Sequence, residues 1–392
     1  MNKHRTVQEY LALLFLAMFF YGLCVQMVGT MISRIILHYD IKMAQAGLLS
    51  SFQYAGNFVA VFIVTVFSGR INKIIILGVS VLFLAASFCI ISTAPLFGIL
   101  LVNFSMMGIF YSALDTHINS IVADLRPDNI RVSMSFLHGL YGLGGLSCPI
   151  VIERLAIKFS WTQVYFIISM VLIFYFVVYV LFVKLHWGQL STRLPHAQQA
   201  RFGFLDMIQF FKLKRNVFLW IAMFSYIGSH SIVSIWIKRY VETHLNEPAW
   251  GAYALSAFWI GVVLSRFVVS PNIKAPSLLK ITVGNLIFAL VLATGLLSGS
   301  VYFIVAATLV AGLSAGFTIP LLMAQSCEWY QEKTSFGTLM PLTSLYFSFA
   351  VFPPVSGFIS DNLGIPWGVA LGAICAFMTA VFSEFCRRLS NS

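Results

Sequence analysis

The stretch SALDTHINSIVADL, residues 112 to 125, places an acid, an imidazole and an amide in a segment that is otherwise apolar. Asp115 precedes Leu125 by about 15 Å along a helix, which is half of a bilayer core about 30 Å thick. A charged side chain at that depth costs at least about 2.5 kcal/mol, so an acid there is a functional hypothesis by default. Low-dielectric surroundings favour the neutral carboxyl group, and therefore Asp115 can take up and release a proton as its surroundings open to water. The alternative is a structural acid, hydrogen-bonded permanently to neighbouring helices.

Helical spacing places Asp115 on one stripe with Gly108, Ser112 and Asn119, and we expect this stripe to face the interior of a helix bundle. His117 lies about 200° around the helix from Asp115 and is expected to face a neighbouring helix. The other acids of the chain lie in loops or close to the ends of apolar segments. Asp115 is thus the one carboxylate predicted at depth.

Further polar and aromatic groups in apolar segments are candidates for contact with a solute. The histidines in LHGLYGLGG and YIGSHSIVSIW can bind a solute or a proton, or act as ordinary donors between helices. Uncharged amides and hydroxyls can hydrogen-bond a polyol, and tryptophans can stack on a sugar face or simply pack. The predicted solute-binding candidates are Asn119, Gln26, Gln53, Asn57, His138, His230, Trp236, Trp259, Thr318, Thr343 and Tyr346.

The elements that must position these groups are membrane-spanning helices. Of the 392 residues, 59% are hydrophobic and 9% charged, whereas a soluble domain has about 25% charged residues. Apolar runs of about 20 residues recur along the chain, as helical spans require; barrel strands would alternate over about 10 residues. We predict an all-α integral membrane protein with twelve transmembrane helices, at residues 8–31, 43–67, 74–93, 96–123, 132–152, 160–184, 216–238, 250–270, 279–298, 301–326, 337–359 and 366–386.

The basic residues indicate the orientation of the chain. The net charge is +11, but Lys and Arg lie in short loops rather than in one patch, so no nucleic-acid partner is expected. With the N-terminus in the cytoplasm, most of them fall on the cytoplasmic side, as the positive-inside rule requires. We expect a multi-pass protein of the cell membrane, the bacterial inner membrane, with both termini cytoplasmic. The six scattered cysteines lack CxxC spacing, so neither a disulfide framework nor a metal site is indicated. No cofactor is expected.

The longest polar joint divides the chain into two six-helix halves. We predict an N-terminal half at 1–185, a cytoplasmic linker at 186–215 and a C-terminal half at 216–392. AGLLSSFQYAG in span two and GAYALSAFWIG in span eight match loosely at corresponding positions of the halves. Two repeated halves with a midplane cavity between them are typical of secondary transporters.

Charged residues at the cytoplasmic span ends also repeat between the halves. We expect Arg70 to pair with Asp124, and Arg266 with Glu328, so that the two pairs form a cytoplasmic gate in one conformational state. Surface pairs contribute only about 0–1 kcal/mol each, and simple charge decoration is the alternative. In span five, GLYGLGG followed by Pro149 favours close helix approach and bending.

Four stretches follow one another along the chain, LDTHINSIV, LHGLYGLGG, FWIGVVLSRF and PPVSGFISDNLG. In these stretches and their order the chain resembles, over essentially its whole length, the major facilitator superfamily, and within it the fucose and hexose permease type of proton symporter, whose fourth-helix pattern is similar to LDTHINSIV. The resemblance implies a proton-coupling role for Asp115, with Asn119 as its neighbour. Gly29 stands where fucose permeases have a second acid, and His230 where relatives have an acid in the seventh helix. These departures leave the sugar open and Asp115 as the sole carboxylate for coupling.

The function predicted from the residues and the resemblance is that of a permease, a proton symporter that imports a small polar solute, such as a sugar or related metabolite, by alternating access. The expected partners are this solute, protons and the lipid bilayer, and the protein is expected to be a monomer. The alternative is an exporter, or a carrier of siderophore-like or drug-like compounds, on the same fold. An enzyme is not expected, because no metal-ligand spacing, nucleophile elbow or phosphate loop is present. A channel fits two repeated halves and one buried acid less well than a carrier does.

Overall fold

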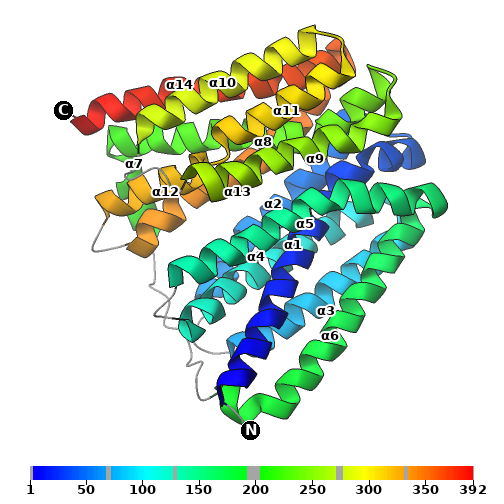
Figure 1. Ribbon diagram of the computed structural model, residues 1–392, viewed down its shortest axis with the longest axis vertical. Helices are drawn as coiled ribbons and strands as arrows, with labels where there is room; N and C mark the ends of the chain where they lie inside the picture. The colour runs from blue at the N-terminus through cyan, green and yellow to red at the C-terminus, as the bar shows by residue number, and fades with distance from the viewer. Residues whose placement is uncertain are drawn as a thin grey trace. The chain divides into compact units, whose positions relative to one another are not determined.

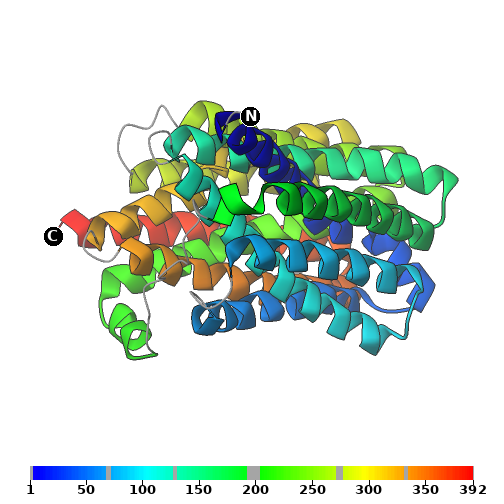
Figure 2. The ribbon, with the colours of Figure 1, turned by 90° about the horizontal axis from the view of Figure 1, so that it is seen from below.

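The computed structural model describes residues 3–67, 72–126, 130–191, 204–270, 277–330 and 334–391, which form helices joined by short connections. Figure 1 shows the helices coloured along the chain, and Figure 2 shows them from below. In chain order the elements are α1 (Lys3–Tyr39), α2 (Met43–Phe67), α3 (Lys73–Ser92), α4 (Phe97–Leu125), α5 (Ile130–Lys158), α6 (Trp161–Ser191), α7 (Phe204–Phe211), α8 (Lys214–Thr243), α9 (Pro248–Leu264), η2 (Ser265–Val269), α10 (Leu278–Leu297), α11 (Val301–Ala315), α12 (Thr318–Trp329), α13 (Thr334–Leu363) and α14 (Ile365–Asn391).

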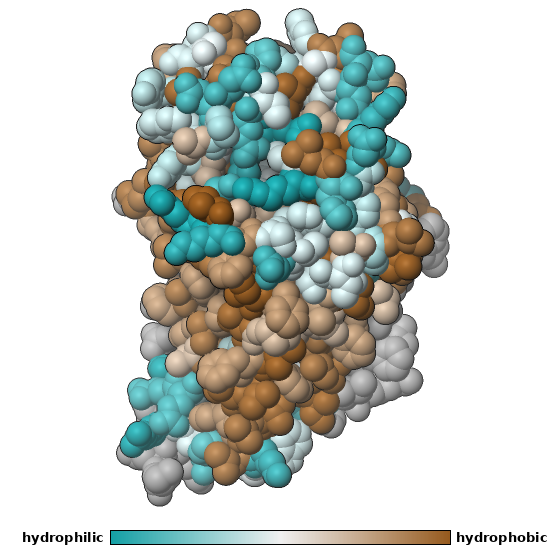
Figure 3. All heavy atoms as spheres, turned by 90° about the vertical axis from the view of Figure 1, so that its right-hand side faces the viewer, coloured by the Kyte–Doolittle hydropathy of each residue, from teal (hydrophilic) through white to brown (hydrophobic). Residues whose placement is uncertain are grey.

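Eleven helices in the described part of the chain are long and apolar enough to cross a membrane. Among these eleven, α9 counts together with η2, and α11 together with α12, whereas the 25-residue α2 coincides with the predicted second span. Large apolar side chains such as Phe174 and Leu290 are 70% and 65% exposed, as side chains in contact with lipid are. Figure 3 shows a broad hydrophobic area in the lower half of the view, with hydrophilic residues above it and again at the lower edge. The predicted all-α membrane fold is confirmed.

Local sequence signals explain where several helices begin and turn. Asn72 caps α3, because its side chain accepts a hydrogen bond from the backbone N–H of Ile74 at 2.9 Å. Ser277 caps α10 in the same way. Gly299 and Gly364 have φ angles of 63° and 96°, a conformation that glycine adopts without a steric penalty. These two glycines therefore allow the tight turns from α10 to α11 and from α13 to α14.

The chain separates into two compact units. Unit 1 comprises residues 1–27 and 52–199, and unit 2 comprises residues 28–51 and 200–392. Within unit 1, α3 packs against α4 and α6; within unit 2, α14 packs against α8 and α10, and α9 packs against α11. α1 and α2 therefore each contribute one part to unit 1 and the other part to unit 2. The predicted division into two halves and a linker stays a prediction.

Two pairs of glycines bring helix backbones together in the same way in the two units. In unit 1, a Cβ atom on Gly56 of α2 would overlap the carbonyl oxygen of Ser105 on α4, and a Cβ atom on Gly108 of α4 would overlap that of Gln53 on α2. In both cases the oxygen belongs to the residue three positions before the other glycine. Gly261 of α9 and Gly312 of α11 stand in the same relation within unit 2. Gly56 and Gly261 also end the two loosely matching stretches of the sequence. The packing of α2 on α4 thus corresponds to the packing of α9 on α11.

Several helices extend beyond the predicted spans, among them α1, which continues to Tyr39, and three spans of unit 2 differ in ways that matter for the site. The sequence predicts that span seven ends at residue 238, whereas α8 continues to Thr243. Span eight ends in the π-helix η2, and span ten is interrupted between α11 and α12. The Nε atom of Arg266 in η2 donates to the carbonyl oxygen of Gly316 at this interruption, at 3.3 Å. The two irregular segments therefore lie side by side, and short π-helices are frequent at functional sites.

Candidate functional site

Asp115 lies on α4 in unit 1, and its side chain is half-buried. The Nδ2 atom of Asn119, one turn further on, donates to both the Oδ1 atom and the backbone carbonyl oxygen of Asp115, at 2.8 Å each. Among the described residues, none on another helix hydrogen-bonds Asp115, and no Lys or Arg pairs with it. The carboxyl group is therefore held from its own helix, without a fixed counter-charge.

The stripe predicted through Asp115 contacts α2 at its other end. Gly108 lies against the backbone of Gln53. With its amide oriented to satisfy the hydrogen bonds, Asn57 donates to the carbonyl oxygens of Gly108 and Gln53 at 2.6 and 3.2 Å. Gln53 and Asn57 are both buried, and Asn57 uses its amide in helix packing. These contacts fix α2 against α4 just beyond Ser112, which is also buried.

The remaining candidates in unit 1 are distributed over three helices. His117 is buried, and its Nδ1 atom lies 2.6 Å from the carbonyl oxygen of Ala113 on the same helix. Gln26 on α1 is buried, and His138 on α5 is exposed. In α5, Gly144 packs against the backbone of α1, as the glycine-rich sequence predicts.

Asp124, near the end of α4, pairs with a lysine that the sequence reasoning missed. The Nζ atom of Lys73 lies 2.7 Å from Asp124 Oδ2 and donates to Ser120 at 2.7 Å, while the lysine side chain is only 8% exposed. Lys73 stands in the basic stretch SGRINKII, and this stretch could have indicated it as a partner for Asp124. Arg70, the predicted partner of Asp124, lies outside the described residues.

The predicted pair of Arg266 and Glu328 is not formed in the described structure. Arg266 donates to Gly316, as described above, and Glu328 accepts a hydrogen bond from Gln325 at 3.3 Å. Both residues lie in unit 2. A gate that forms in another conformational state stays a prediction for all four residues.

His230 on α8 lies in an aromatic cluster within unit 2. Its ring centroid is 5.0 Å from that of Phe258, 5.2 Å from that of Trp259 and 6.3 Å from that of Phe349. The imidazole is buried, and its Nδ1 atom has no hydrogen-bond partner among the described residues. A buried polar atom without a partner is unfavourable, so this nitrogen is suited to a ligand or a water molecule. The structure therefore brings two predicted solute-binding residues, His230 and Trp259, together.

The other candidates in unit 2 make structural hydrogen bonds. The indole N–H of Trp236 donates to the carbonyl oxygen of Pro353 at 3.2 Å, and Asn285 donates to Thr318 at 2.9 Å. Thr343 accepts from the indole of Trp220 and donates to the backbone of its own helix. Tyr346, on the same helix, is half-buried. These hydrogen bonds tie α8 to α13 and α10 to α12.

Within unit 2, the parts of α1 and α2 that belong to it are bonded to α8 and α13. Asp361 of α13 accepts hydrogen bonds from the backbone N–H groups of Met43 and Ala44, the first residues of α2, at 2.9 and 2.8 Å. Further along α2, Ser50 and Ser51 donate to backbone carbonyl oxygens of α13 at 3.0 and 2.5 Å.

A second set of contacts holds α1 against α8. Ser33 donates to Glu242 Oε2 at 2.6 Å, and Glu242 in turn pairs with Lys238, whose side chain is 1% exposed. Gly29 lies directly against the carbonyl oxygen of Ser234, where any side chain would collide. We call these two sets, from Asp361 to α2 and from α1 to α8, the closure contacts. The sequence predicts Asp361 and Glu242 near span ends, close to water, and it does not predict these contacts.

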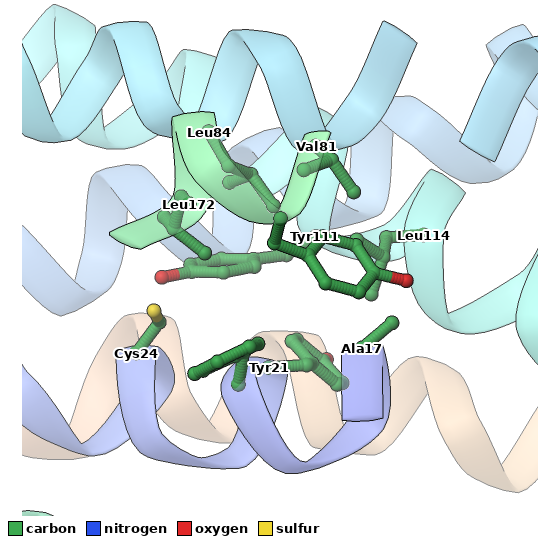
Figure 4. Close-up of a pocket in the computed structure, with 10 residues that line it drawn as sticks. Ala17, Tyr21, Cys24, Val81, Leu84, Tyr111, Leu114 and Leu172 are labelled. Atoms are coloured by element: carbon green, nitrogen blue, oxygen red, sulfur yellow. The ribbon is translucent and has the colours of Figure 1, made fainter. Parts of the chain in front are cut away.

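A pocket inside unit 1 lies among α1, α3, α4 and α6 (Figure 4). Tyr21 and Cys24 of α1 face Tyr111 of α4 across it, and the two tyrosine ring centroids are 5.3 Å apart. The rest of its lining is mainly apolar and consists of Ala17, Phe20, Val81, Leu84, Leu114, Leu172 and Tyr175. None of the predicted solute-binding residues lines this pocket, which is therefore separate from the candidate site.

Known proteins resemble the chain in sequence profile and in fold. Residues 14–275 match the profile of the Major Facilitator Superfamily, whereas no curated protein sequence matches the chain significantly. A bacterial homologue of the human lysosomal transporter Spinster has a TM-score of 0.77 and 13% identity, over 98% of this chain and 97% of that chain. The E. coli fucose:proton symporter FucP has a TM-score of 0.64 and 17% identity, over 97% and 99%. A peptide transporter, POT, in complex with alafosfalin has a TM-score of 0.77 and 13% identity, over 100% and 99%.

Proposed function

Because the chain belongs to the major facilitator superfamily, a class of membrane transporters, we propose that it is a secondary active transporter that moves a small polar solute by alternating access and couples this movement to protons through Asp115. The proposal includes uptake as a symporter, a monomer, and a location in the cell membrane with both termini cytoplasmic. The observation that carries it is the Asp115 carboxyl group on α4, bonded by Asn119 of its own helix and by no described cation.

The surroundings of Asp115 suit a group that changes its protonation. A carboxylate locked into a buried ion pair would have to break that pair before accepting a proton, at a cost of several kcal/mol. Asp115 has no such pair in the described structure, and Asn119 can donate to the carboxyl group in either protonation state. Proton uptake at Asp115 therefore does not require a described ion pair to break.

The aromatic cluster around His230 supports a solute with both polar and apolar faces. The Nδ1 atom of the imidazole can donate to or accept from a hydroxyl group, depending on the tautomer, and Trp259 offers a flat ring beside it. A sugar presents hydroxyl groups at its edge and C–H groups on its face, so it matches this pair. FucP, among the structures of similar fold, is a fucose:proton symporter.

The closure contacts support a transport cycle in which α1 and α2 change partners. Parts of both helices belong to unit 1, whereas their remaining parts are bonded to α8 and α13 in unit 2. A movement of unit 1 against unit 2 requires either that these hydrogen bonds break or that the two helices bend. Their breaking and re-forming would alternate access to the solute site.

Uptake by purified protein in proteoliposomes with an imposed pH gradient tests the coupling. The Asp115→Asn variant should lose proton-driven accumulation and retain exchange of labelled for unlabelled solute, because exchange needs no net proton movement. Glu247→Gln, at an exposed residue between α8 and α9, is the matched control and should retain both activities. Uphill uptake by Asp115→Asn at the wild-type rate would refute the coupling role.

The second candidate function is export, or transport of larger apolar or chelating compounds. The rings of Phe258 and Phe349 beside His230 favour it, because they present more apolar than polar surface. A binding screen of sugars against hydrophobic cations and siderophores on the purified protein separates the two candidates. Binding of the cations or siderophores alone would favour this second function.

A further inference from the structure

The short helix α7, which precedes α8, is fixed to the end of unit 2 by one buried side chain. Phe210 is 1% exposed and packs with Met340, Trp220 and Tyr330. Its carbonyl oxygen accepts a hydrogen bond at 2.8 Å from Nδ2 of Asn216, which also donates to the hydroxyl of Tyr330. Figures 1 and 2 both show α7 at the same end of unit 2 as the C-terminal end of α14.

The residues around this anchor leave apolar surface exposed, although the ring of Phe211 also packs edge-on against Trp220, with centroids 5.8 Å apart. Ile208, Phe211 and Leu213 are 45%, 40% and 46% exposed, although all three are large and apolar. Lys212 and Lys214, which alternate with them, are also exposed. In the described structure neither lysine takes part in an ion pair. Side chains of residues 204–207 lie outside this description.

The position of the segment relative to the bilayer gives these side chains a partner. Leu213 is the residue before α8, and α8 is a membrane-crossing helix that begins at Lys214. A segment directly before a membrane-crossing helix is expected near the level where the hydrocarbon core meets the headgroups. Apolar side chains at this level insert into the acyl boundary, while lysines extend toward the phosphates.

We propose that residues 208–214 form a membrane-surface anchor that binds anionic phospholipid, with Ile208, Phe211 and Leu213 in the acyl boundary and Lys212 and Lys214 on the headgroup phosphates. The basic charge selects anionic over zwitterionic lipid, because a juxtamembrane lysine is attracted to a negative leaflet surface. Arg215 does not belong to this anchor, since its guanidinium group lies over the ring of Trp329, 4.8 Å from the centroid. The anchor sets the depth of the segment that leads into α8.

The test measures membrane depth and does not depend on transport. A spin label at Ile208→Cys, in the full chain with the six native cysteines replaced, is examined by collision with oxygen and with an aqueous nickel complex. In vesicles of phosphatidylcholine with phosphatidylglycerol, the label should be reached by oxygen and protected from nickel. In pure phosphatidylcholine the protection should fall several-fold, and added salt should reduce it in the mixed vesicles. A label at Glu247→Cys, an exposed residue, should be reached by nickel in both.

Charge variants identify the residues responsible. Lys212→Gln with Lys214→Gln should remove the difference between the two vesicle types. Arg154→Gln with Lys158→Gln, which removes two exposed charges at the end of α5, should preserve it. A label that nickel reaches in both vesicle types would overturn the anchor. Equal protection in both types would overturn the selection of anionic lipid, and protection that appears only when a soluble protein is added would indicate a protein partner instead.

Discussion

The Oδ1 atom of Asp361 in α13 lies 2.9 Å from the backbone nitrogen of Met43, the first residue of α2. The other oxygen of the same carboxylate accepts the N–H of Ala44. The first N–H groups of a helix have no partner within that helix, and the positive end of the helix dipole lies there. One acid thus satisfies two such groups from another helix and couples α13 to α2.

Replacing Asp361 is expected to weaken this connection. A helix-capping side chain contributes about 0.5–2 kcal/mol, so Asp361→Ala should raise the population of molecules with α2 separated from α13 by roughly tenfold. Spin labels at Lys42→Cys and Leu363→Cys, read as a distance distribution, measure this population. Asn362→Ala is the control, because Asn362 is exposed and donates to its own helix at Phe358. An unchanged distance distribution in Asp361→Ala would contradict the role of Asp361 in holding α2 against α13.

Asn119 is predicted to matter for coupling more than for exchange. Hydrogen bonds to charged groups contribute about 1.5–3 kcal/mol, and Asn119 provides the described side-chain hydrogen bond to Asp115. Asn119→Ala should therefore lower pH-driven uptake about tenfold or more while exchange falls less. Thr116→Ala, on another face of α4, should leave both rates near wild type. Equal losses in uptake and exchange would point to a structural role for Asn119.

The repeated glycine contacts predict equal sensitivity in the two units. Gly56→Ala and Gly261→Ala each place a methyl group against a backbone carbonyl oxygen of the facing helix. Overpacking of this kind costs about 1–3 kcal/mol, so both variants should unfold at lower temperature than wild type. Gly98→Ala is the control, because a Cβ there has no other atom within 4 Å. A thermal shift in only one of the two variants would show that the packing is not equivalent.

The buried pair of Lys238 and Glu242 should respond strongly to single substitutions. Removing one partner of a buried ion pair deprives the other charge of its counter-charge, which typically costs about 3–5 kcal/mol. Lys238→Met and Glu242→Leu should each destabilise the protein more than the double variant does. Thermal unfolding of all four proteins provides the double-mutant cycle. Additive effects would mean that the two charges do not depend on each other.

The sequence was sufficient for the type and the approximate positions of the membrane spans, because a span needs a long apolar run and polar joints interrupt these runs visibly. It was also sufficient to relate Asp115 to Asn119, since both lie on one helix with a spacing of four residues. The spacing of neighbouring residues is a local property. The helical type of the spans and the Asp115–Asn119 contact within one helix were therefore predictable, whereas the π-helix η2 and the interruption between α11 and α12 were not.

Contacts between distant segments were not predictable in the same way. Asp361 meets Met43 across more than 300 residues, and hydropathy treats both as ordinary span ends. Lys238 was predicted as the last residue of span seven because a charge usually ends a span, whereas its partner one turn away allows it to be buried within α8. The grouping of His230 with Trp259 likewise depends on how α8 packs against α9.

α1 runs without interruption from Lys3 to Tyr39, a length of about 55 Å at 1.5 Å per residue. Its residues up to Met27 belong to unit 1, and those from Val28 onward belong to unit 2, where Ser33 is bonded to Glu242. The boundary between the two units therefore falls inside one continuous helix, two residues before Gly29, and not in a loop. Any change in the direction of one end of α1 must be followed by the other end or taken up by a bend within the helix.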